Sequence, residues 1–110
     1  MIVERYLAAL TSHDWSDLRD CLASDVVRVG PYNDEYRGVD EYVGFLSALM
    51  PTLPDYSMDV RRVTYTDTRA FAELSETVGG IRTDEAIVFE LADDGRIARV
   101  DVFIKTTMPS

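Results

Sequence analysis

The sequence has very little cysteine and histidine, with one of each, Cys21 and His13, among 110 residues. A single cysteine cannot form an internal disulfide, and a metal site or Ser-His-Asp triad would depend on one histidine. Cys21 follows helical apolar spacing and has no base nearby in the sequence, which favours a packed thiol over a nucleophile. We therefore expect no metal and no cofactor.

Basic residues and long apolar runs are also scarce. Lys and Arg number 11 against 20 Asp and Glu, a net charge of −9, which repels phosphate backbones and anionic lipid. No stretch approaches the roughly 20 apolar residues that span a bilayer. These features argue against nucleic acid and membranes as partners. The first residues lack the basic and apolar pattern of a signal peptide, so a cytoplasmic location is the expectation.

The length fits one domain over residues 1–110, without repeats or linkers. Three segments have helical apolar spacing. The first is residues 2–10, and the second begins at Asp14, a good N-cap. The third is residues 39–50, which stops before Pro51. The apolar stripe of the second helix is Trp15, Leu18, Cys21 and Leu22.

The remaining segments alternate as strands do. A short strand at residues 26–29 precedes a polar excursion at residues 32–38. A long strand at residues 56–65 changes parity near Arg61 and Arg62, which predicts a bulge. Residues 71–91 form a hairpin that turns at Gly79 and Gly80, and residues 97–105 are the last strand. Three helices on one curved antiparallel or mixed sheet give an α+β fold.

Two acids interrupt the apolar face of the central hairpin. Glu76 lies on the face with Leu74 and Val78, and Glu85 on the face with Ile87. A carboxylate there loses hydration unless it borders a pocket or a wet sheet end. The two readings are a functional acid pair in a cavity and two glutamates that reach water near the sheet end.

The order of elements and several motifs resemble a known family. These motifs are RYLAAL, Asp14-Trp15, LASDVVRVGPY, Arg37-Gly38 and FELADDGRIARVDVF. Together they are similar to the SnoaL-like polyketide cyclases of the nuclear transport factor 2-like superfamily. The resemblance implies a cone-shaped roll, in which the sheet wraps around the three N-terminal helices and leaves an apolar cavity for a small hydrophobic molecule.

The resemblance extends to ketosteroid isomerase, another member of this superfamily. Its oxyanion-hole tyrosine corresponds to Tyr6, so the resemblance implies that role for Tyr6. Its general-base aspartate falls on Gly30, and its second oxyanion donor falls on Ile87. The resemblance therefore argues against that isomerase mechanism, because the base and one donor are missing.

Limonene epoxide hydrolase shares one acid with this chain. Its Arg-x-Asp pair falls on Leu74 and Glu76, and its second aspartate falls on Val102. Asp101 has the opposite parity and is expected outside the cavity. Of the three catalytic residues of the epoxide hydrolase, this chain therefore keeps one acid, at Glu76.

We interpret Glu76 as the general acid or base, assisted by Glu85, with Tyr6 and Arg28 as oxyanion or carboxylate partners. Inward glutamates on neighbouring strands lie within roughly 5–8 Å, so one is expected to hold a proton unless Arg28 reaches it. The alternative is an ion cluster at the cavity mouth and a core tyrosine. Residues expected to bind substrate or line the walls are Arg28, Tyr32, Leu46, Leu49, Tyr56, Met58, Leu74, Ile87 and Val102.

The resulting hypothesis is a cyclase, isomerase or dehydratase that acts on a hydrophobic carbonyl compound. The alternative is a binding or dimerisation module without chemistry. Phe71, Val88 and Phe103 lie on the outer sheet face, which favours a homodimer through that face.

Overall fold

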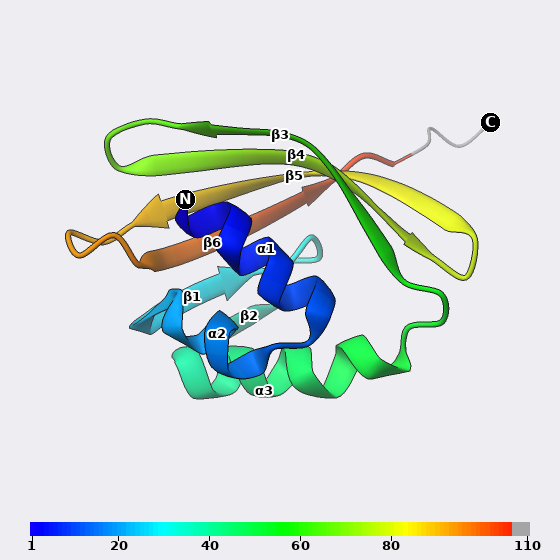
Figure 1. The fold of residues 1–110 in the computed structure, drawn as a ribbon, viewed down its shortest axis with the longest axis horizontal. Helices are drawn as coiled ribbons and strands as arrows, with labels where there is room; N and C mark the ends of the chain where they lie inside the picture. Colours follow the sequence, from blue (N-terminus) through cyan, green and yellow to red (C-terminus); the bar gives the residue numbers. More distant parts are fainter. Residues whose placement is uncertain (107–110) are drawn as a thin grey trace.

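The computed structural model describes residues 1–106 and confirms the predicted α+β architecture (Figure 1). Helices α1 (Ile2–Ser12), α2 (Trp15–Asp20) and α3 (Val39–Leu49) pack on one mixed sheet. Its six strands are β1 (Leu22–Val29), β2 (Glu35–Arg37), β3 (Ser57–Tyr65), β4 (Arg69–Val78), β5 (Ile81–Leu91) and β6 (Ile97–Ile104). The sheet order is β2-β1-β6-β5-β4-β3, with only β1 and β6 parallel.

The two N-terminal helices begin and end for local reasons. In α1, Val3, Tyr6, Leu7 and Leu10 recur on one buried face. The helix ends at His13, whose left-handed backbone lets its N–H bond the carbonyl of Leu10. Asp14 then caps α2, as predicted, by accepting the Asp17 N–H at 3.1 Å.

Two sequence-based boundaries were wrong. Leu22 does not continue α2, which ends at Asp20 with Cys21 as its C-cap. Leu22 instead opens β1, four residues before the predicted start of that strand, and pairs with Ile97. The polar excursion contains a strand, β2, which pairs antiparallel with β1 from Val27 opposite Arg37. A three-residue strand is too short to show an alternating pattern, and only the tertiary pairing defines it.

The central hairpin follows the prediction. Strands β4 and β5 pair from Val78 opposite Ile81, and both turn glycines have positive φ, 57° at Gly79 and 82° at Gly80. The register of β3 on β4 shifts between Val60 and Arg62, where the bulge was predicted. A short 3-10 turn, Met50–Thr52, follows α3.

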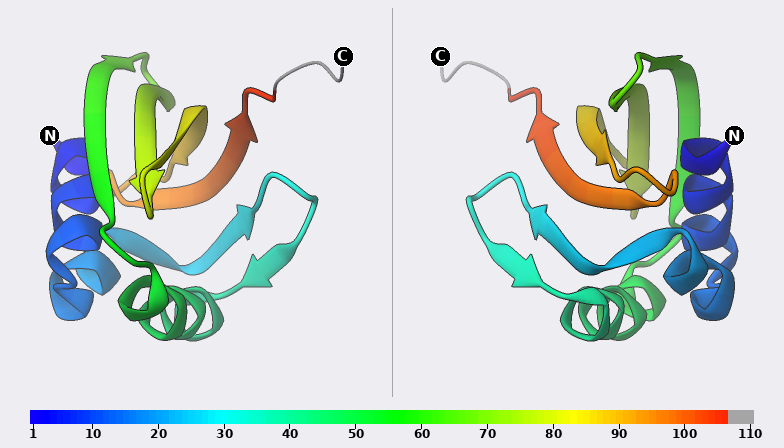
Figure 2. Two further views of the ribbon diagram at one scale, coloured as in Figure 1. Left: turned by 90° about the vertical axis from the view of Figure 1, so that its right-hand side faces the viewer. Right: turned by 90° about the vertical axis from the view of Figure 1, so that its left-hand side faces the viewer.

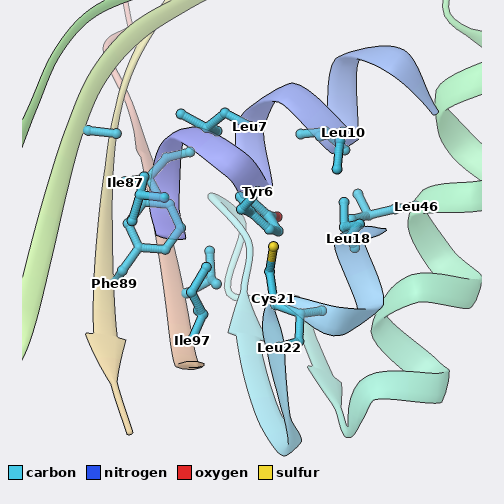
Figure 3. Close-up of a cluster of buried hydrophobic side chains, with 14 of the residues drawn as sticks. Tyr6, Leu7, Leu10, Leu18, Cys21, Leu22, Leu46, Ile87, Phe89 and Ile97 are labelled. Atoms are coloured by element: carbon cyan, nitrogen blue, oxygen red, sulfur yellow. The ribbon is translucent and has the colours of Figure 1, made fainter. Parts of the chain in front are cut away.

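The sheet curves strongly around the helices (Figure 2). Helix α1 lies against the concave face of the sheet, and Figure 3 shows its side chains meeting those of α2, α3 and the last strands. Tyr6 packs edge-on against Phe89, with ring centres 5.8 Å apart. The thiol of Cys21 is fully buried in this core, and burial raises its pKa. In the described residues, no helix has the length and apolar character needed to cross a membrane.

Candidate functional site

A cavity of about 440 Å³ lies between the concave face of the sheet and the helices. Twenty residues from both layers line it: Tyr6, Leu10, Arg28, Pro31, Tyr32, Tyr42, Leu46, Leu49, Leu53, Tyr56, Met58, Glu76, Val78, Ile81, Thr83, Glu85, Ile87, Val100, Val102 and Ile104. The walls are mainly aliphatic and aromatic, with a few polar groups, which is the usual composition of a small-molecule site.

The structure brings nearly all the residues singled out from sequence to this one cavity. Glu76, Glu85, Tyr6, Arg28 and the other wall residues named above line it; Leu74 does not. Leu74 is 1% exposed and belongs to the core, two residues farther than Glu76 from the turn of the hairpin. The prediction that the Leu74 side chain points inward was correct, but at this position the packed core leaves no cavity.

Glu76 and Glu85 reach the cavity from neighbouring strands. Glu76 pairs with Thr83 across the ladder, and Glu85 pairs with Leu74, so the two acids are diagonal neighbours on one face. The Tyr56 hydroxyl donates to Glu76 Oε2, and Glu85 also hydrogen-bonds Glu76. Glu76 therefore accepts hydrogen bonds from two cavity side chains.

Burial and Glu76 together raise the pKa of Glu85 to about 9. Burial has the largest effect, followed by the hydrogen bond to Glu76 and then by the negative charge of Glu76. The charge of Arg28 opposes the rise. Burial and the neighbouring Glu76 also raise the pKa of Tyr56. At neutral pH, Glu85 is thus protonated and can donate a hydrogen bond.

Tyr6 contacts a partner that the sequence reading did not identify. Its hydroxyl forms a hydrogen bond with the hydroxyl of Tyr42 from α3, and both rings are buried. Burial raises the pKa of both tyrosines, and for Tyr42 the charge of Arg28 opposes this effect. A tyrosine within an apolar helical stripe needs a partner for its hydroxyl, which is the signal that could have revealed Tyr42.

Arg28 forms its ion pair with Asp34 rather than with either cavity glutamate. Nη1 of Arg28 lies 3.6 Å from Asp34 Oδ2. Gly30 permits this arrangement, since a Cβ at position 30 would lie 2.6 Å from the same oxygen. The Asp34 carboxylate thus occupies the space beside the backbone that a side chain at position 30 would fill.

Asp101 lies outside the cavity-lining set, as predicted, and forms an ion pair with Arg99 at 2.9 Å. Within residues 1–106, no three His, Cys, Asp or Glu side chains lie close enough together to hold a metal ion. The polar side chains that line the cavity carry carboxyl, phenol, hydroxyl and guanidinium groups.

Comparison with solved structures defines the class of fold. A nuclear transport factor 2-like protein of unknown function from Burkholderia xenovorans LB400 has a TM-score of 0.84 at 15% identity, with 99% of this chain and 84% of that chain covered. An LEH-like epoxide hydrolase from M. tuberculosis has a TM-score of 0.79 at 23% identity, covering 94% and 80%. A steroid delta-isomerase from Pseudomonas aeruginosa has a TM-score of 0.77 at 20% identity, covering 96% and 78%. The chain thus has a nuclear transport factor 2-like fold.

Within that fold class, the chain belongs to the SnoaL-like family, because the model of the SnoaL-like domain matches residues 3–100. This match confirms the resemblance drawn from the sequence motifs. No curated protein sequence matches the chain significantly.

Proposed function

We propose that this protein is a small-molecule enzyme that moves a proton next to a carbonyl group in a hydrophobic substrate. The observation that carries the proposal is the pair of glutamates, Glu76 and Glu85, which are diagonal neighbours on adjacent strands inside an apolar cavity. Solved structures of the same fold include a steroid delta-isomerase and an epoxide hydrolase, which supports small-molecule chemistry on this scaffold.

The two acids have different roles in this proposal. Glu76 carries the negative charge and removes a proton from the carbon beside the carbonyl. Glu85 carries a proton at neutral pH and donates to the oxygen on which the enolate charge develops. Tyr56 fixes the Glu76 carboxylate by its hydrogen bond. Return of the proton from Glu76 to a different carbon of the enolate gives isomerisation. Attack of the enolate carbon on a second carbonyl, whose oxygen then takes up a proton, gives cyclisation.

Proton exchange on a simple ketone tests this proposal. We expect the protein to catalyse exchange of the α-protons of 2-tetralone in D₂O, followed by proton NMR. Glu76→Gln is expected to reduce the catalysed rate by about 100-fold or more, the usual contribution of a positioned base. Glu73→Gln is the control, because Glu73 lies on the outer face of the same strand in an ion pair with Arg62. Equal rates in wild type and Glu76→Gln would refute the role of Glu76.

The second candidate is a binding module for a small hydrophobic ligand, without turnover. It is favoured by the two hydrogen bonds that Glu76 already accepts, because each one weakens a carboxylate as a base. Ligand binding without any catalysed exchange would select this function.

We also propose that the protein forms a homodimer through the outer face of its sheet. Phe71 lies opposite Val88 in the β4–β5 ladder, and Phe103 lies opposite Ala86 in the β5–β6 ladder. Phe103 is 58% exposed and Phe71 is 36% exposed in the single chain. Contiguous exposed aromatic residues are a common feature of subunit contacts.

A further inference from the structure

Arg28 supplies the positive charge among the residues that line the cavity. Its side chain is only 14% exposed. The guanidinium carbon lies 5.3 Å from the ring centre of Phe45 and 5.9 Å from those of Tyr36 and Tyr42. Tyr36 and Phe45 are themselves stacked, with ring centres 4.0 Å apart. These three rings hold the charged group in a defined place.

The guanidinium has hydrogen-bonding capacity that the described residues do not use. Nη1 of Arg28 is buried and has no hydrogen-bond partner within residues 1–106. The nearest Asp34 oxygen, at 3.6 Å, is beyond ordinary hydrogen-bond distance. The other oxygen of Asp34 is likewise buried and unpartnered among these residues. A buried donor without an acceptor costs free energy, and a small shift of the guanidinium toward a ligand oxygen in the cavity would recover it.

The charge and planar shape of Arg28 fit a carboxylate best. A guanidinium can donate two parallel hydrogen bonds to the two oxygens of a carboxylate. A phosphate dianion fits less well, since the cavity also holds two glutamates and the protein has a net charge of −9.

We propose that Arg28 binds a carboxylate group of the ligand, so that the cavity selects hydrophobic acids over their neutral analogues. This inference rests on the proposed function, and it narrows the substrates to oxo acids that combine a carboxylate with an enolisable carbonyl. The apolar walls would contact the hydrocarbon part of such a molecule.

Three acidic groups bear on this site. Asp34 shares the charge of Arg28, but it is not among the cavity-lining residues and it leaves the guanidinium at a distance beyond hydrogen bonding. Glu76 and Glu85 both line the cavity, and Glu85 is neutral at pH 7 because its pKa is raised to about 9. The protonation of Glu85 thus removes one of the two charges that would repel an anionic ligand from within the cavity.

The test compares 2-naphthoate with its uncharged amide, 2-naphthamide, by calorimetric titration at pH 7. We expect the wild type to bind the acid about tenfold or more tightly than the amide, as a charge-assisted hydrogen bond implies. Arg28→Gln is expected to abolish this preference. Arg37→Gln, the same charge change at an exposed residue outside the cavity, is expected to retain it.

Two further variants keep the test decisive if Arg28→Gln does not fold. Arg28→Lys retains the charge and is expected to retain part of the preference for the acid. Asp34→Asn removes the competing anion and is expected to increase the preference several-fold over wild type. If Arg28 and Asp34 only stabilised the fold, their substitutions would not change the preference for the acid in opposite directions.

Equal affinity of the wild type for the two probes, or no binding of either at millimolar concentration, would overturn the proposal. The Glu76→Gln variant separates the test of ligand binding by Arg28 from the test of the proposed chemistry. In that variant we expect the acid preference to persist while 2-tetralone exchange is lost. Loss of exchange in Glu76→Gln without any acid preference in wild type would refute the Arg28 site and leave the Glu76 mechanism standing.

Discussion

Glu85 shows how one buried side chain makes stability depend on pH. Its folded pKa of about 9 exceeds the value of 4.5 for an ordinary glutamate. Between those values the native state therefore holds a proton that the unfolded state has released. It follows that the free energy of unfolding falls as pH rises through this window, and that Glu85 contributes an energetic cost at neutral pH.

Replacement of Glu85 by glutamine is expected to remove this cost. The variant should unfold at higher urea concentration than wild type at pH 8, with little difference at pH 4, where Glu85 is protonated in both states. Glu73→Gln is the control, since the hydrogen-bonded ion pair with Arg62 lowers the pKa of Glu73, the opposite direction to the shift of Glu85. An equal stability difference between Glu85→Gln and wild type at both pH values would contradict the assignment.

The hairpin of β1 and β2 depends on a close contact at one glycine. A Cβ on Gly30 would lie 2.6 Å from Asp34 Oδ2 and 2.7 Å from its Cγ, so the Asp34 side chain or the turn must move. We expect Gly30→Ala to lower the free energy of unfolding by about 1–3 kcal/mol, the range for overpacked sites.

Gly44 provides the matched control within α3. A Cβ there would meet nothing within 4 Å, and the residue is in the interior of the helix. Gly44→Ala is therefore expected to stabilise the protein by about 0.5–1 kcal/mol through helix propensity. Chemical denaturation of the two variants beside wild type measures both effects. Similar destabilisation by both substitutions would show that the contact with Asp34 is not the cause.

Local patterns predict this fold well where they extend over several residues. The alternation around Glu76 and Glu85 gave the correct inward faces, and the parity change at Arg61 and Arg62 located the bulge. The short strand β2 carried no comparable signal. The ion pair between Arg28 and Asp34 could not be predicted from the sequence either. The turn from Gly30 to Asp34 brings these two side chains together only when β2 pairs with β1.

At the scale of the whole molecule, the curved sheet has an inner face that borders the cavity and an outer face through which we propose that the protein dimerises. We expect sedimentation equilibrium at micromolar concentration to show a dimer. Phe103→Asp is expected to weaken association at least about tenfold, since it places a charge in an apolar contact. Ile81→Asp, at the exposed tip of the hairpin, is the control and should leave the dimer intact. A wild type that is entirely monomeric would rule out this interface.

The same scaffold hosts a steroid delta-isomerase and an epoxide hydrolase at 20% and 23% identity, so the fold does not choose the reaction. In the function that we propose, the acids and the arginine inside the cavity choose it. The proposed function rests on their arrangement, in which Glu76 accepts a hydrogen bond from Tyr56 and interacts with Glu85.

The most direct test of that arrangement is a carbon-13 NMR titration of the glutamate carboxyl groups in wild type and Glu76→Gln. We expect one carboxyl, that of Glu85, to titrate near pH 9 in wild type. In Glu76→Gln its pKa should fall, because the neighbouring negative charge is gone, yet stay above the usual range because burial remains. If every glutamate titrates near its ordinary value of about 4.3, the acids are solvated and no proton is held between them.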